Sequence, residues 1–305
     1  MSIRTPSTTQ SRQSLLDLQR TKERLALNNE RIASGKRLTN PGDDPTAAAA
    51  ILDFGNSIQM NTQSIKSADS ALSYLSLSED VVNAAVEANM RLQELSVSGS
   101  SASAPEIDAI IANLMSLANT QVQGKYLFAG AKTTTLPFEV NAGATTPPAL
   151  GTGPASYGGD EKAISLDITS TTTVVTNVNG SEVFFGPGGQ GSSTDFFSVA
   201  TRLRDALAAN PRVPADIKQV ATDLQGVLNN LNLVLTKLGG RQAGLFGLKD
   251  TLSGFNVTLQ GMQNTQQDTD YPTAAIEFAN DQTIQSATLS ALAKTNKANL
   301  FDYLG

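Results

Sequence analysis

Cysteine, histidine and tryptophan are all absent from this chain of 305 residues, and aromatic residues make up only 5% of it. Without cysteine there are no disulfides, and without both cysteine and histidine the usual zinc ligands are missing. A cysteine nucleophile and a histidine general base are excluded for the same reason, so only carboxylate or lysine chemistry remains. We therefore expect a protein that is not an enzyme and that holds no cofactor and no metal.

Basic charge and long apolar runs are also scarce. The net charge is -6 and the isoelectric point is about 4.8, whereas nucleic-acid binders carry a basic face. The one basic cluster, residues 20–37, is interrupted by Glu23 and Glu30 and is interpreted as a solvated helix face. No run approaches the roughly 20 apolar residues of a membrane span, and the N-terminal segment lacks the apolar stretch of a secretory signal. Neither nucleic acid nor a membrane is expected as a partner.

The chain does contain apolar residues repeated at a spacing of seven, which is typical of coiled coils and long bundle helices. The pattern predicts helices over residues 10–33, 45–97, 105–123, 196–209, 214–238, 240–267 and 272–303. We expect the core of a helical rod to include Ile51, Ile58, Ile65, Leu72, Leu224, Leu231, Leu245 and Leu252.

Residues 130 to 195 differ in character from the rest, because Thr, Gly and Pro dominate and the apolar runs are short. Residues 163–168 alternate with a period of two, and residues 173–175 and 182–185 are short apolar runs. These patterns predict strands. The middle of the chain is therefore expected to form a small β-rich insert.

This layout predicts a mainly α fold: an elongated rod of long helices or coiled coil, built from paired N- and C-terminal segments, with a small β-rich domain inserted in the middle. Three domains are expected. Residues 1–44 with 270–305 form a terminal helical coiled coil, residues 45–130 with 196–269 a helical rod, and residues 131–195 the insert. The terminal domain is expected to be disordered in the monomer, because Lys22 and Asn29 interrupt its seam and its last helix is diluted with Gln, Thr and Asn.

Two motifs allow both a chemical and a structural interpretation. Residues 186–191 fit the glycine pattern of a dinucleotide site, but Pro187 and the lack of a second parallel strand favour a flexible hinge. Asp43 and Asp44 are paired carboxylates suited to a metal or to acid/base work. We favour the alternative that they cap a helix beginning at Pro45.

Three stretches together resemble the bacterial flagellin superfamily. They are residues 31–45, with the sequence RIASGKRLTNPGDDP; residues 124–130, GKYLFAG, followed by Pro137-Phe138; and residues 298–304, ANLFDYL. The last two are similar to the junction branch of the family rather than to flagellin. The resemblance implies a structural junction protein that joins the flagellar hook to the flagellin filament and assembles as a ring through its terminal helices. Flagellin, the filament subunit, stays the alternative.

The resemblance also implies partners and a location. The partners are further copies of the chain in a ring, the other hook–filament junction protein (flagellar hook-associated protein 1), flagellin, and a flagellar export chaperone at the C-terminal segment. The location is the extracellular hook–filament junction of the bacterial flagellum, reached by type III export without a cleaved signal peptide. The terminal-helix positions expected to mediate assembly are Leu18, Leu25, Ile32, Phe278, Leu289, Leu292, Leu300, Tyr303 and Leu304.

Overall fold

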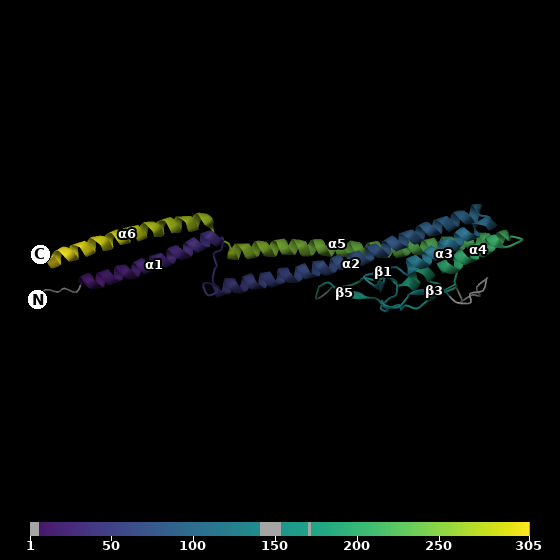
Figure 1. The fold of residues 1–305 in the computed structure, drawn as a ribbon, viewed down its shortest axis with the longest axis horizontal. Helices are drawn as coiled ribbons and strands as arrows, with labels where there is room; N and C mark the ends of the chain where they lie inside the picture. The colour runs from purple at the N-terminus through teal and green to yellow at the C-terminus, as the bar shows by residue number, and fades with distance from the viewer. Residues whose placement is uncertain (1–5, 141–153, 170–171, 305) are drawn as a thin grey trace. The chain divides into compact units, whose positions relative to one another are not determined.

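The computed structural model describes residues 6–140, 154–169 and 172–304, and the side chains of residues 12–293 within those ranges. The chain divides into two compact units, each described by itself below (Figure 1). The terminal unit comprises residues 1–60 and 255–305, and the central unit comprises residues 61–254. Long helices with small two-stranded sheets between them confirm the predicted mainly α fold class. The finer division into three domains stays a prediction.

The helices begin and end close to the predicted positions, with two corrections. Their bounds are α1 (Pro6–Ser34), α2 (Pro45–Ser98), α3 (Ala104–Ala118), α4 (Phe196–Ala208), α5 (Pro214–Gln267) and α6 (Tyr271–Leu304). The helix predicted over residues 105–123 ends at Ala118, because Gln121–Val122 is a strand. The predicted break near residue 239 is wrong, since α5 is one continuous helix. Each of the two glycines there costs a helix about 1 kcal/mol relative to alanine. Burial of Leu238 and Leu245 on either side outweighs that cost.

The core of the central unit forms where α2 packs against α5. The amide nitrogen of buried Asn89 donates to the Leu224 carbonyl at 3.2 Å, and Lys249 pairs with Asp69 at 2.7 Å. Helices α3 and α4 cover this pair and add their own apolar faces. Buried members of the resulting cluster include Ala68, Leu75, Val82, Leu92, Ile107, Leu114, Leu203, Leu224, Leu231 and Leu238.

Aromatic rings join the β-rich segment to these helices. Phe138, on β3 (Phe138–Val140), lies 5.1 Å from the ring of Tyr157, on β4 (Ala155–Tyr157), and 5.3 Å from that of Phe184. The predicted strand at residues 182–185 is wrong, because Ser181–Phe185 is a short π-helix. Three consecutive side chains from Val183 to Phe185 are buried there, and a strand sends alternate side chains to opposite faces.

The remaining strands are short antiparallel pairs. β1 (Gln121–Val122) pairs with β2 (Lys125–Tyr126), and β3 pairs with β4. β5 (Ser165–Asp167) pairs with β6 (Thr173–Val175), with Leu166 opposite Val174. β5 and β6 confirm two of the predicted strands.

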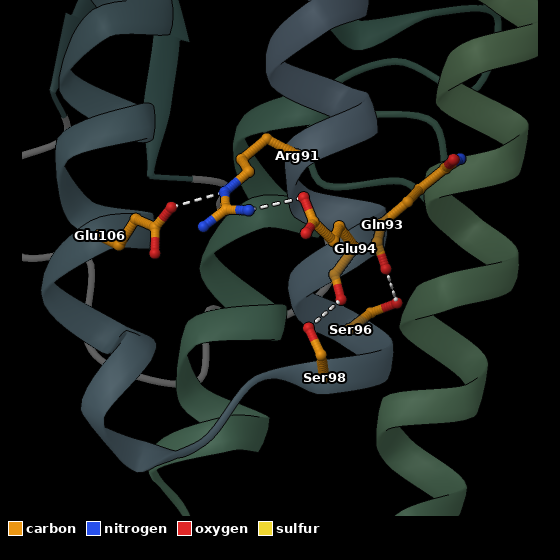
Figure 2. A network of polar contacts seen from close by, with 6 residues as sticks. All are labelled: Arg91, Gln93, Glu94, Ser96, Ser98 and Glu106. Atoms are coloured by element: carbon orange, nitrogen blue, oxygen red, sulfur yellow. Dashed lines mark hydrogen bonds and ion pairs between the residues drawn. The ribbon is translucent and has the colours of Figure 1, made fainter.

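A surface network holds the turn between α2 and α3 (Figure 2). The guanidinium of Arg91 donates to Glu106 on α3 at 2.6 Å and to Glu94 on α2 at 2.5 Å. Both bonds, that to Glu106 most of all, raise the pKa of Arg91. The hydroxyls of Ser96 and Ser98 donate back to the carbonyls of Gln93 and Glu94. These hydroxyls add a second donor to carbonyls of the last turns of α2.

Candidate assembly interface in the terminal unit

A short backbone pairing connects the ends of α1 and α5. The Thr269 N–H donates to the Gly35 carbonyl at 2.9 Å, and the Arg37 N–H donates to the Gln267 carbonyl at 2.7 Å. We call residues 35–37 and 267–269 the clasp. Gly35 has φ of 72°, and a Cβ on it would lie 2.7 Å from the hydroxyl of Tyr271. Glycine is therefore favoured here for its conformation, and a larger residue would also displace the Tyr271 hydroxyl.

Arg37 connects the clasp to the start of α2. Its guanidinium donates to the Gln266 carbonyl at 3.0 Å and lies 3.7 Å from the Asp44 carboxylate. The other Asp44 oxygen accepts the Ala47 N–H at 3.0 Å. Asp44 therefore acts as the helix cap, the alternative favoured from sequence. No group of three or more acidic side chains that could hold a metal ion occurs in the part of the chain that the structure describes.

The centre of the α1–α6 pair is polar. Thr21 and Asn28 on α1, and Ala274 and Asp281 on α6, are buried, and each pair is seven residues apart. The Asp281 carboxylate, in a residue only 6% exposed, accepts from Arg24 at 2.8 Å and from Asn28 at 3.2 Å. A buried carboxylate needs such donors, because desolvating it without them is costly. The polar line was missed in the sequence, although its spacing of seven was a readable signal.

The predicted assembly positions flank this polar line. Leu18, Leu25, Ile32, Phe278 and Leu292 are half-buried, and Leu289 is exposed. Leu300, Tyr303 and Leu304 lie in the last part of α6, where side chains are outside the described residues. Further apolar side chains that the sequence analysis did not select are exposed nearby, namely Leu15, Leu16, Ile276 and Ile284.

A groove of about 710 Å³ lies between α1 and α6 beside the buried polar line. Its walls include charges of alternating sign, from Asp17, Arg20, Glu23 and Arg24. Leu27 and Ile284 add apolar surface to it. The two helices therefore leave both apolar and charged surface available for a third element.

The predicted rod positions divide into two groups. Leu224, Leu231, Leu245 and Leu252 on α5 are buried. Ile51, Ile58, Ile65 and Leu72 on α2 are half-buried, because the neighbouring strip through Ala68, Leu75 and Val82 occupies the centre of the contact.

The glycine-rich segment 186–191 is a closed turn. The Gly191 N–H donates to Asp195 at 2.6 Å, and the Gly188 N–H donates to Thr194 Oγ1 at 3.2 Å. Asp195 also caps α4 by accepting the Ser198 N–H at 3.2 Å. Burial raises the pKa of the Asp195 carboxyl, and the bonds from Gly191 and Ser198 offset part of that rise. These amides are engaged within the turn, so they do not form a phosphate cradle.

The N-terminal part of the chain matches a known protein family. Residues 7–133 match the family of the bacterial flagellin N-terminal helical region. The chain carries a flagellin N-terminal region. This match confirms the resemblance to the flagellin superfamily, and it covers α1, α2 and α3.

Two curated relatives of this chain share one name. Flagellar hook-associated protein 3 of Salmonella typhimurium is 31% identical over 165 residues, which are 51% of this chain and 48% of the relative. Flagellar hook-associated protein 3 of Escherichia coli is 28% identical over 205 residues, 61% of this chain and 60% of the relative. The matched region thus spans between about half and three fifths of the length of these relatives.

Solved structures of low sequence identity share the fold. Bacillus cereus FlgL has a TM-score of 0.56 and 21% identity, covering 70% of this chain and 99% of that one. A flagellar hook-associated protein from Vibrio parahaemolyticus has a TM-score of 0.61 and 17% identity, covering 74% of this chain and 100% of that one. No helix among the described residues is both long and apolar enough to cross a membrane.

Proposed function

We propose that this protein is a structural junction protein that joins the bacterial flagellar hook to the flagellin filament, and that it assembles as a ring through its terminal helices. One observation carries the proposal. The α1–α6 pair buries Thr21, Asn28 and Asp281 at its centre while Leu16, Ile276 and Leu289 are 51%, 63% and 48% exposed. Apolar residues that lie on the outside of a helix pair are suited to packing against further helices.

The energetics of a lone helix pair favour this assignment. A fully buried Leu or Ile side chain contributes about 1.5–3 kcal/mol, and ordering the backbone costs about 1–2 kcal/mol per residue before hydrogen bonds offset part of it. The few half-buried apolar residues of α1 and α6 therefore cannot hold some thirty residues of helix each. Neighbouring copies would supply the missing apolar contacts, so that folding of the terminal helices and joining of subunits become one event.

The same proposal sets the partners and the place of action. The chain packs against copies of itself, against flagellar hook-associated protein 1 on the hook side and against flagellin on the filament side. A flagellar export chaperone holds the C-terminal segment before export without a cleaved signal peptide. The protein acts outside the cell, in the flagellum, as a building block rather than as an enzyme. The names of the relatives support a flagellar role.

Flagellin itself is the second candidate, since the matched N-terminal region is named for flagellin. The two candidates differ in what the purified chain does alone. A filament subunit polymerises into long filaments, whereas a junction protein does not. Electron microscopy of the concentrated chain, seeded with hook fragments, separates them.

Complementation of a strain that lacks hook-associated protein 3 tests the junction role. The parent chain should restore filaments, and immunogold labelling should place it at the hook tip. A double variant Ile276→Ser with Leu289→Ser should be exported but should leave flagellin unattached in the medium. The matched control is Leu233→Ser, which changes an equally exposed apolar residue in the central unit. Normal filaments with the double variant, or loss of filaments with the control alone, would contradict assembly through the terminal helices.

A further inference from the structure

A cavity of about 290 Å³ lies in the central unit between α2, the β1–β2 hairpin and the β5–β6 pair. Neither the core nor the junction role uses it. Cavities of this size and somewhat larger, lined by apolar and aromatic side chains with a few polar groups, are typical of small-molecule sites. Its lining residues are Ser70, Ala71, Tyr74, Lys125, Tyr126, Leu127, Thr133, Ile164, Ser165, Leu166, Thr176 and Asn177.

The walls of the cavity are largely apolar or aromatic. Ala71 and Leu127 are buried, and Ile164 and Leu166 are half-buried beside them. A ligand with an apolar body would gain dispersion contacts with these walls.

Three polar groups of the lining are already used by the fold. One is the Ser70 hydroxyl, which donates to the Lys66 carbonyl at 3.0 Å. The Asn177 side chain accepts the Ile164 N–H at 2.7 Å and donates to the Lys162 carbonyl at 3.0 Å. The Thr176 hydroxyl donates to the Ile164 carbonyl at 3.1 Å. These bonds shape the wall and leave little for a ligand.

Four further polar groups of the lining are donors without a protein partner in the part of the chain that the structure describes. Among the described residues, no hydrogen bond or ion pair engages the ammonium of Lys125 or the hydroxyls of Tyr74, Tyr126 and Ser165. Lys125 is the sole charged residue of the lining. The cavity therefore presents one positive charge and several free O–H donors around an apolar floor, which suits an anion on an apolar body.

The sequence motif at residues 124–130 contains both structural and unexplained positions. Leu127 and Phe128 enter the core, and Gly130 has φ of 64° in a turn against Asp160. Lys125 and Tyr126 belong to the lining of the cavity, where Lys125 is exposed and Tyr126 is half-buried.

We propose that this cavity binds a small organic anion with a planar aromatic body, its ring between Tyr74, Tyr126 and the apolar floor and its anionic group at Lys125. This site is separate from the proposed junction role and does not depend on it. Aromatic faces pack well against tyrosine rings, and a carboxylate gains a charge-assisted bond from the ammonium.

Isothermal titration of the full chain with 2-naphthoate, and with 2-naphthamide as its neutral isostere, tests the site. Naphthoate should bind at least about tenfold more tightly than the amide, a difference of about 1.4 kcal/mol. Lys125→Gln should abolish this preference, while Lys132→Gln, an exposed lysine outside the lining, should retain it. Leu166→Trp should block both compounds by filling the cavity, and Thr133→Phe does the same at a less central position should Leu166→Trp impair folding.

Thermal melts and circular dichroism of each variant establish that it is folded before titration. The proposal is overturned if naphthoate shows no saturable binding at millimolar concentration. It is equally overturned if Lys125→Gln keeps the preference for the anion, or if folded Thr133→Phe and Leu166→Trp chains bind like the parent.

Discussion

The central and terminal units bury opposite kinds of side chain. The central unit encloses Leu224, Leu231 and a cluster of aromatic rings, whereas the terminal unit encloses Thr21, Asn28 and Asp281. An apolar interior stabilises a unit by itself, because each buried side chain gains transfer and packing energy. A polar interior gives little net stability, because hydrogen bonds there replace hydrogen bonds to water. We therefore predict that the central unit folds alone and that the terminal unit needs neighbours.

Hydrogen exchange on the verified monomer should show the largest contrast. Amides of α1 and α6 should exchange almost at once, while amides around Leu231 on α5 should be protected by global stability. Mass spectrometry of peptides from each region measures this directly. Strong protection of α1 and α6 in the monomer would mean that the terminal helices are a preformed docking surface instead.

The next largest difference between the two units should appear when one apolar side chain in each is truncated. Phe184 is fully buried and contacts Phe128, Phe138 and Phe197, so Phe184→Ala should cost about 3–5 kcal/mol of unfolding free energy. Leu25→Ala in the terminal unit should leave the main transition in urea unchanged. Equal losses for the two variants would show that both units unfold together.

Replacing either of two glycines of the central unit by alanine should change the free energy of unfolding, in opposite directions for the two sites. Gly130 has positive φ, and a Cβ there would collide with the backbone of Asp160, so Gly130→Ala should destabilise by at least about 1–2 kcal/mol. Gly247 lies in α5 with open space around its missing Cβ, so Gly247→Ala should stabilise by about 1 kcal/mol. Denaturation of both variants in parallel measures the pair, and a shared sign would contradict the glycine assignments.

The smallest expected effect is the pH dependence of stability that comes from Asp195, a buried carboxylate of the central unit. Burial raises the pKa of Asp195 above its ordinary value of 3.8, so the folded state binds the proton more tightly than the unfolded state. The stability that this provides is complete below pH 3.8 and is lost as pH rises through the folded pKa. The difference between the urea midpoint of the parent and that of Asp195→Asn should therefore decrease as the pH rises above about 4. A rise over that range would reverse the assignment.

The helical layout was predictable because its signals are local. Proline at residues 45 and 214, together with a sustained spacing of seven, set where α2 and α5 begin. The continuity of α5 was not predictable, since two adjacent glycines indicate a break and only the burial of Leu238 and Leu245 overrides it. The π-helix at 181–185 was not predictable for a similar reason, because only the surrounding aromatic rings require three consecutive side chains to face inward.

The positions of individual side chains in the rod and in the terminal helices were predicted less well than the fold. Large apolar side chains suggested that Ile58, Ile65 and Leu72 would lie at the centre of the α2 contact, but smaller Ala68 lies there, in a strip with Leu75 and Val82. A helix pair in close contact favours small residues at its closest points, which an apolar spacing alone does not reveal. Asp281 was overlooked because a lone carboxylate in a helix normally indicates a solvated face.

The bond between Arg24 and Asp281 determines how α1 and α6 align. Seven residues before Arg24 stands Asp17, and seven before Asn28 stands Thr21. If α6 slid one heptad away from the clasp, Asp281 would face Asp17 instead of Arg24, and the two carboxylates would repel each other. Sliding α6 the other way would require the clasp to open. A contact that adds little to stability thus favours a single alignment of this helix pair, and every copy in the proposed ring would then present the same face to its neighbour.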